Sequence, residues 1–356
     1  MKKAISLAAA LLLSSAHAVP AQTQAPAPKL PAMFTTRPAI SSYATPVAYP
    51  KANAAAVADH FNKARKLAGD ALFVFFDTLC VQDQLYKERI NGVQYNGIIP
   101  AQKVFDNVYY LGQMMVSAWA IDTPAGIILI DALNNADEAR EIMVPGLKAM
   151  GLDPARIKYV IITHSHGDHY GGAQFFKDTY GAKLVASAVD WEVMANPNAP
   201  FRNIKLFDLP PKKDAGDLAV KDGDTLSLGG QDIHFALTPG HTPGTISLTF
   251  KVTDKGVPHV AGMFDGVGMP RTDDMKKVQL QSIAHWMDVT RKAGVDVQMG
   301  NHPLHFAGPT RLEILRYRQA GQKHPFVVGG PVYQRFMGML GECVKTSLAR
   351  DGVVVP

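Results

Sequence analysis

The chain has 356 residues, of which 47% are hydrophobic and 19% are charged, a composition typical of a globular protein that buries one large core. Its formal net charge of +5 is too weak to indicate nucleic-acid binding, and no cluster of Lys and Arg is interleaved with aromatic residues. Composition and charge therefore give no reason to expect a nucleic-acid partner.

The first eighteen residues contain the three parts of a cleavable secretory signal. Lys2 and Lys3 precede an apolar run over residues 4–13, and small residues follow up to Ala18. An uncleaved anchor helix is the weaker alternative, because the apolar run is far shorter than the roughly 20 residues that span a bilayer. We therefore expect residues 1–18 to be removed, the protein to be exported to the periplasm or secreted, and no stable membrane insertion.

Export would place the two cysteines, Cys80 and Cys343, in an oxidising compartment where a disulfide persists. Such a bond would join the N-terminal part of the chain to the C-terminal part. Two separately buried thiols are an equally good interpretation, since the sequence gives no distance between the two residues.

Two segments precede the main body of the chain. Residues 19–50 are crowded with Pro, Ala, Thr and Ser and predict an extended leader. An N-terminal extension follows over residues 51–102. It contains a predicted helix over residues 52–68, ending before a glycine, and a short apolar segment over residues 71–76 that we expect to be buried.

Apolar, β-rich runs begin near residue 103 and alternate with helical patterns up to about residue 310. The order of strands, helix and strand predicts a layered α/β core over residues 103–310. A C-terminal helical segment follows over residues 311–356. The predicted strands cover residues 104–112, 114–122, 126–133, 157–163, 183–187, 259–264 and 295–300, with two more joined by a Gly-Gly turn over residues 224–240. The predicted helices cover residues 137–151, 171–181, 278–293 and 332–350.

Three imidazoles and one carboxylate lie within six residues, directly after an apolar strand: His164, His166, Asp168 and His169. Imidazole and carboxylate together suit zinc. His164 and His166 are two residues apart, so in an extended chain they project to the same side and can bind one ion. Gly167 lets the backbone turn, so that Asp168 and His169 can face a second ion. A solvated polar loop is the alternative, and the position between a strand and a helix disfavours it.

This HxHxDH pattern resembles the defining loop of the metallo-β-lactamase superfamily, and the resemblance covers roughly residues 103–310. It implies a four-layer αβ/βα sandwich fold. It also implies two further ligands, which are His241 in a Gly/Pro-rich turn over residues 238–244 and His302 after an apolar strand. His305, three residues further along, is the rival for the last position.

The resemblance implies two Zn²⁺ ions. The first would be bound by His164, His166 and His241, and the second by Asp168, His169 and His302. A water between the ions would lose its proton near neutral pH, since zinc lowers the pKa of a bound water to about 7. Asp168 would orient the resulting metal-bound hydroxide while it attacks a carbonyl carbon, so that the protein supplies no nucleophile of its own.

Two further carboxylates are assigned from the same resemblance. Asp131 follows a strand and matches the family's buried carboxylate that supports a metal ligand, with a simple strand-end cap as the alternative. Asp265 has two interpretations. It bridges both ions, as in the lactonase and glyoxalase II branches, or it supports a ligand from behind and Gly266 replaces the Ser that β-lactamases carry there.

The ligand set looks like the third subclass of metallo-β-lactamases, which implies a β-lactam as the first substrate hypothesis. An exported lactonase, esterase or thioesterase acting on another cyclic amide or ester is the second, because Arg271 is the one tentative basic partner for a β-lactam carboxylate. A di-iron redox protein is a third hypothesis, but that branch has Glu where His166 stands. A non-catalytic zinc-binding protein is disfavoured, since no ligand position is lost.

Overall fold

The computed structural model describes residues 39, 41, 45–86, 97–199 and 202–355. Ala44–Pro356 form one compact unit that holds the helices and strands described below. The predicted signal over residues 1–18 and most of the leader over residues 19–50 lie outside the described residues. Among those described, no helix has the length and apolar character needed to cross a membrane.

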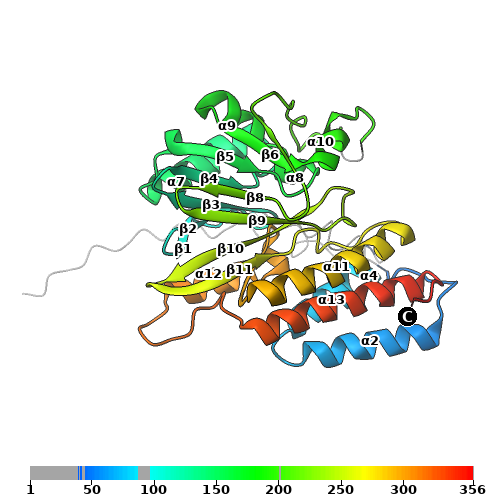
Figure 1. Cartoon of the computed structure of the whole chain (residues 1–356). Coiled ribbons are helices and arrows are strands. Elements are labelled where there is room, and N and C mark those ends of the chain that lie inside the picture. Colours follow the sequence, from blue (N-terminus) through cyan, green and yellow to red (C-terminus); the bar gives the residue numbers. More distant parts are fainter. Residues whose placement is uncertain (1–38, 40, 42–44, 87–96, 200–201, 356) are drawn as a thin grey trace, which may run out of the picture. The chain divides into compact units, whose positions relative to one another are not determined.

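Two β-sheets lie face to face between two layers of helices (Figure 1). The first sheet has seven strands in chain order: β1 (Gln102–Phe105), β2 (Val108–Gly112), β3 (Ser117–Thr123), β4 (Gly126–Ile130), β5 (Ile157–Ile161), β6 (Lys183–Ser187) and β7 (Leu218–Val220). The second has five, in the spatial order β12-β11-β10-β9-β8: β8 (Thr225–Leu228), β9 (Gln231–Leu237), β10 (Ile246–Asp254), β11 (Val257–Met263) and β12 (Val297–Met299). This is the predicted four-layer α/β sandwich.

The helices fall on the outer faces of the two sheets. The first sheet is covered by α7 (Val144–Ala149), α9 (Ala173–Tyr180) and α10 (Ala188–Ala195). The second is covered by α11 (Asp273–Ala293) and α13 (Gly330–Arg350), with α2 (Ala54–Ala68) packed against α13. Shorter helices are α3 (Phe73–Phe76), α4 (Asp83–Leu85), α6 (Ala136–Glu138), α8 (Gly167–Tyr170) and α12 (Gly308–Arg316).

Strand β4 shows how the sequence builds these layers. Successive side chains of a strand point to opposite faces, so Ile128 and Ile130 enter the core between the two sheets while Ile127 and Leu129 enter the core beneath the helices. All four are fully buried. A strand covered on both faces consists of consecutive apolar residues, which explains why residues 127–130 of β4 are all apolar.

Strand direction places the functional loops. β4 and β5 are parallel, and so are β11 and β12, so within each pair the carboxyl ends lie at the same edge of the sheet. The first pair leads into Asp131 and the loop of His164. The second pair leads into Asp265 and into the segment of Asn301 and His302.

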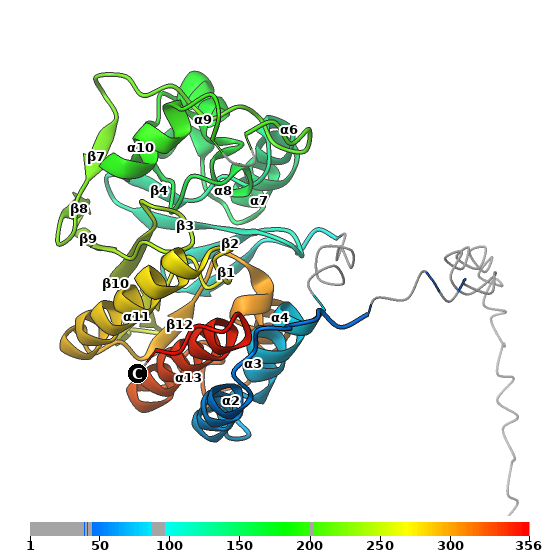
Figure 2. The ribbon, with the colours of Figure 1, turned by 90° about the vertical axis from the view of Figure 1, so that its right-hand side faces the viewer.

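The N-terminal extension and the C-terminal segment form one helical layer. Cys80, in the helical turn Asp77–Gln82, is disulfide-bonded to Cys343 of α13, with their Cα atoms 4.9 Å apart. Helices α2, α11 and α13 lie side by side in both Figure 1 and Figure 2. The structure therefore agrees with the interpretation that the two cysteines form a disulfide, and not with two separate thiols.

Several predicted elements have different bounds in the structure, for identifiable reasons. Residues 71–76 were expected to be buried, but they form the start of a helix in which Phe73 and Val74 face outward, 48% and 54% exposed, while Phe75 and Phe76 face the core. The predicted strand over residues 104–112 is a hairpin, β1 and β2. The nine-residue strand β10 was not predicted, although its residues alternate between apolar and polar from Ile246 to Thr253 as strand residues do.

Candidate metal centre

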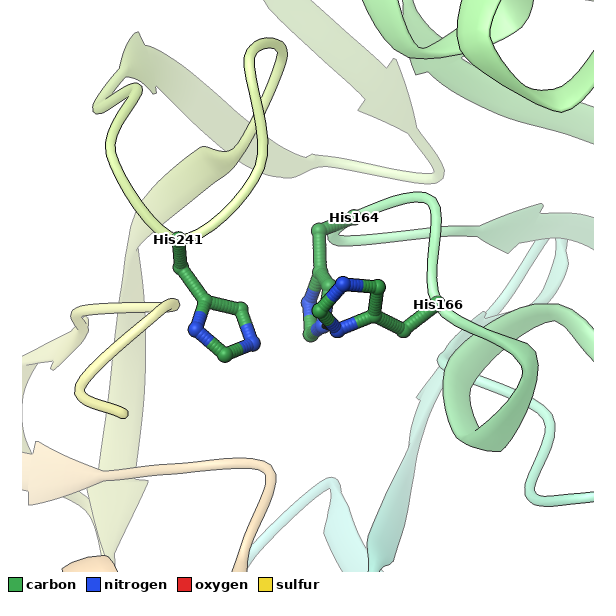
Figure 3. A group of neighbouring side chains, drawn as sticks. All are labelled: His164, His166 and His241. Carbon is green, nitrogen blue, oxygen red and sulfur yellow. Dashed lines mark hydrogen bonds between the residues drawn. The ribbon is translucent and has the colours of Figure 1, made fainter. Parts of the chain in front are cut away.

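The first predicted ligand set converges at the edge where the two sheets meet. His164 Nε2 and His166 Nδ1 lie 3.1 Å apart, and the ring of His241 lies 4.7 Å from each of the other two rings, centroid to centroid. One nitrogen from each of the three lies within 4.8 Å of the others. Figure 3 shows His241 reaching from its own loop toward His164 and His166 on the opposite loop.

Acceptors fix the outer nitrogens of two of these three rings. His241 Nδ1 donates to the carbonyl oxygen of Gly268 over 3.1 Å, and His164 Nδ1 donates to Asp265 Oδ2 over 2.7 Å. Because Nδ1 carries the proton in both rings, the lone pair of the neutral imidazole is on Nε2 and faces the other ligands. Burial lowers the pKa of His164 and of His166, so both rings are neutral and able to bind a cation.

The second predicted set has the same design. His169 Nε2 lies 3.2 Å from His302 Nε2, and Asp168 Oδ2 lies 3.5 Å and 3.7 Å from these two nitrogens. His169 Nδ1 donates to Asp131 Oδ2 over 2.7 Å, and His302 Nδ1 donates to the carbonyl oxygen of Met115 over 2.8 Å. His164 adjoins both sets, since its ring centroid is 4.0 Å from that of His169.

These contacts fit a pair of metal ions. In each set the inward atoms are acceptors that face one another, and a cation between them is what removes the repulsion of their lone pairs. Burial opposes a charge on His169, but Asp168 and Asp131 outweigh it and raise the pKa of that imidazole. The two carboxylates therefore favour a positive charge at this place, which a cation bound to the neutral ring would supply. Imidazole and carboxylate donors suit zinc.

The structure separates the two interpretations of Asp265. Its Oδ2 accepts from His164 Nδ1, so the carboxylate stands behind a ligand. The backbone at Gly266 is left-handed, with φ +74°, and a Cβ there would lie 2.6 Å from His241 Cβ. A Ser at this position would therefore displace His241.

Asp131 also contacts the outer nitrogen of a predicted ligand, His169. Besides His169, it accepts from the backbone N–H and the hydroxyl of Thr163, over 2.9 Å and 2.8 Å. It has φ 60°, a conformation that costs energy in a non-glycine residue and that these bonds hold in place.

Two further residues named from the sequence lie away from the ligand sets. The ring of His305 is 5.3 Å from that of His302, centroid to centroid, and its buried Nδ1 makes no hydrogen bond within the described part of the chain. His302, and not His305, reaches His169. Arg271 is exposed in the segment before α11.

Sequence reasoning missed Asp190, which joins the two loops of the first set. Its buried carboxylate accepts from the N–H and hydroxyl of Ser165, from the hydroxyl of Thr242 and from the N–H of Gly244, over 2.8–3.0 Å. Burial raises its pKa to about 6 although these bonds oppose the rise. The one sequence signal is Ser187, whose hydroxyl caps α10 by accepting from Asp190 N–H.

A cavity of about 250 Å³ adjoins the second set. Met115, whose carbonyl oxygen holds His302, is in its wall. The full lining is Gly97, Ile98, Gln113, Met115, Asn134, Glu138, Ile142 and Leu206. It is largely apolar, and among these eight described residues none is Lys or Arg.

Comparison with known proteins agrees with this geometry. The family model described as "Metallo-beta-lactamase superfamily" matches residues 111–254. The chain is 28% identical to a hydroxyacylglutathione hydrolase of Cereibacter sphaeroides over 127 residues, which is 36% of this chain and 42% of that protein. It spans less than two thirds of the length of this and other curated relatives.

Solved structures share the fold over most of their length. BJP-1, a subclass B3 metallo-beta-lactamase of Bradyrhizobium japonicum, is similar with a TM-score of 0.58 and 25% identity, covering 70% of this chain and 93% of that one. A variant of the metallo-beta-lactamase FEZ-1 from Legionella gormanii has a TM-score of 0.60 and 22% identity, covering 73% of this chain and 98% of that one.

Proposed function

We propose that this chain, which matches the metallo-β-lactamase superfamily over residues 111–254, is a metal-dependent hydrolase that binds two zinc ions and opens the amide bond of a β-lactam. One observation supports this proposal above the others: two neighbouring groups of three side chains each point nitrogen or oxygen acceptor atoms toward one another. His164, His166 and His241 would hold one ion, and the second would be held by Asp168, His169 and His302.

The chain's own residues divide the work between binding and orientation. Zinc, when bound, supplies a polarised water of lowered pKa and a Lewis acid for the carbonyl oxygen. Asp131 and Asp265 fix the rings of His169 and His164, so the ligand geometry exists before substrate arrives. Asp168, the carboxylate within the ligand set, would orient the water or hydroxide that attacks the carbonyl carbon.

One contact favours a β-lactam over an ester. In the lactonase and glyoxalase II branches, the carboxylate at the position of Asp265 bridges the two ions. Here Asp265 is engaged with His164 Nδ1 and with Asn301, which leaves the two ligand sets without a bridging carboxylate from this strand. This supports the arrangement of the β-lactamase branch.

Hydrolysis of a thioester or lactone is the second candidate, and two observations favour it. Several curated relatives bear the name hydroxyacylglutathione hydrolase. The cavity beside His302 offers no cationic side chain among its described lining residues for the carboxylate that a β-lactam carries. A neutral, apolar acyl group would suit it.

We propose further that the protein is exported. The pairing of Cys80 with Cys343 supports this location, because disulfides persist in oxidising compartments and are rare in the cytosol. Together with the predicted signal over residues 1–18, it gives two independent reasons for the same assignment.

The test is hydrolysis by the purified zinc-loaded protein of a penicillin, a carbapenem, a lactone and a thioester, with His166→Ala as the inactive control. We expect β-lactam opening that the control lacks. Turnover of the lactone or thioester with no β-lactam turnover would replace the first candidate by the second. Elemental analysis that returns two iron atoms in place of zinc would reject both and support the redox alternative.

A further inference from the structure

We infer that Asn301 couples the two metal positions, by holding the two carboxylates that stand behind them. Asn301 follows β12 and is 2% exposed. Its amide nitrogen hydrogen-bonds to Asp265 Oδ1 and lies 3.3 Å from Asp131 Oδ2. It is a positioning residue, since it contacts neither the inward atoms of the ligands nor the cavity.

The contacts form one continuous chain between the ligand sets. It runs from His164 through Asp265, Asn301 and Asp131 to His169, with hydrogen-bond contacts at each step. All five side chains are buried, so water does not compete for these bonds. A change in the orientation of one imidazole is therefore transmitted to the other.

An amide is the side chain that this place requires. Its NH₂ group has two hydrogens, which point in different directions and can serve two carboxylates at once. The same nitrogen lies 3.1 Å from Thr163 Oγ1, which itself donates to Asp131. An aspartate would bring a third carboxylate and no donor, and an alanine would leave oxygens of both carboxylates without this partner.

The position of Asn301 is fixed from outside the metal centre. Its carbonyl oxygen accepts from Ser117 N–H over 2.7 Å, and the carbonyl oxygen of its neighbour Gly300 accepts from Trp119 Nε1 over 2.9 Å. Both donors belong to β3 of the other sheet. The backbone at Asn301 is thus anchored to β3, its side-chain amide lies between the two carboxylates, and the residue directly precedes the predicted ligand His302.

The consequence concerns the order of metal uptake. Two adjacent cations repel each other, which by itself makes the second ion bind more weakly than the first. Binding at the first set orders His164 and Asp265. Through Asn301 this orders Asp131 and His169 in advance, so the second ion meets a formed site. We expect the wild-type protein to take up both ions in one transition, without accumulation of a one-ion form.

The inference rests on the two-metal centre of the proposed function, and its test measures metal binding rather than turnover. The metal-free protein is titrated with Zn²⁺ against a chromophoric chelator, and with Co²⁺ while its visible absorption bands are recorded. Asn301→Ala removes both hydrogen bonds, and Asn301→Ser retains a single donor. Asn134→Ala is the matched control, because Asn134 is 1% exposed, lies near Asp131 in the sequence and donates to Glu138 instead.

In Asn301→Ala we expect the one transition to separate into two, with the second ion bound about 10- to 100-fold more weakly, the usual effect of losing a residue that supports a ligand. Asn301→Ser should lie between this variant and the wild type, and Asn134→Ala should match the wild type. A single transition in both Asn301 variants would overturn the coupling, and so would an equal separation in Asn134→Ala. Wild-type protein that binds fewer than two ions would overturn the two-metal centre as well. Two bound ions without turnover of any substrate would reject only the proposed function.

Discussion

The helical layer and the metal centre of this protein are stabilised by different interactions. In the layer of α2, α3 and α13, apolar side chains pack on one another, as in the edge-to-face contact of Phe75 with Phe336 at 5.3 Å between centroids. One disulfide joins segments 263 residues apart. In the candidate metal centre, four imidazole rings are each held by one directional hydrogen bond from the outer ring nitrogen. They are the rings of His164, His169, His241 and His302. Apolar packing tolerates substitutions of similar volume, whereas a directional bond depends on one donor and one acceptor.

The difference implies that stability and metal binding can be changed separately. The predicted ligands and the disulfide belong to different elements, since Cys80 and Cys343 lie in the helical core and the ligands lie in the strand-end loops. Substitutions more than about 10 Å apart that share no partner have additive effects. Each of the following experiments tests whether the two regions are independent, or measures how strongly one of them depends on a single bond.

The largest effect is expected for a ligand. His166→Ala should lower hydrolysis by on the order of 10³-fold, because one ion loses a ligand and the substrate loses the Lewis acid. The unfolding temperature of the metal-free protein should stay near that of the wild type. His259→Ala is the control, since His259 pairs with Asp296 outside the ligand sets. Loss of the folded state in His166→Ala would show that the two regions are not independent.

The next effect concerns stability alone. Replacing both Cys80 and Cys343 by Ser should lower the free energy of unfolding by about 2–5 kcal/mol, because the bond closes a long loop in the unfolded chain. Denaturant unfolding measures this change, and the zinc titration should remain that of the wild type. A tenfold weaker zinc affinity in the double variant would contradict the separation.

A third experiment uses pH to measure how the Asp190 carboxyl group contributes to the free energy of unfolding. The folded-state pKa of Asp190 is raised to about 6 from 3.8, so its contribution to stability is fully present below pH 3.8 and is lost as the pH rises through about 6. The stability of the wild type relative to Asp190→Asn should therefore fall by about 3 kcal/mol between pH 4 and pH 7. Unfolding in the presence of a chelator measures it. Parallel pH profiles of the two proteins would show that Asp190 keeps an ordinary pKa.

The smallest effect is expected at one directional bond. Asp265→Asn should weaken zinc binding at the first set by about 10- to 100-fold, because an amide NH₂ group then faces the NH₂ group of Asn301 or the N–H of His164. Asp296→Asn is a matched control, since Asp296 accepts from His259 Nδ1 over 2.6 Å in the same way. Equal zinc affinities in the two variants would mean that Asp265 does not position His164.

The sequence predicted those elements of the fold that a local pattern of residues produces. The helix after residue 52 is observed as α2, with Asn53 capping its start and Gly69 at its end. The Gly-Gly turn between β8 and β9 has φ +56° and +87°, values that glycine adopts without strain. Strand β10 was missed although its residues alternate between apolar and polar, so the local pattern was present in the sequence and was not used.

By itself the sequence determined that the side chains from His164 to His169 lie close together. Six neighbouring residues that directly follow a strand belong to the same loop, whatever the rest of the fold. Tertiary structure alone decided that His302 rather than His305 reaches His169, that Asp265 stands behind His164, that Cys80 meets Cys343 and that Asn301 lies between two carboxylates. Each of these contacts joins segments more than 30 residues apart. Their distances depend on strand order and register, which no local pattern of residues encodes.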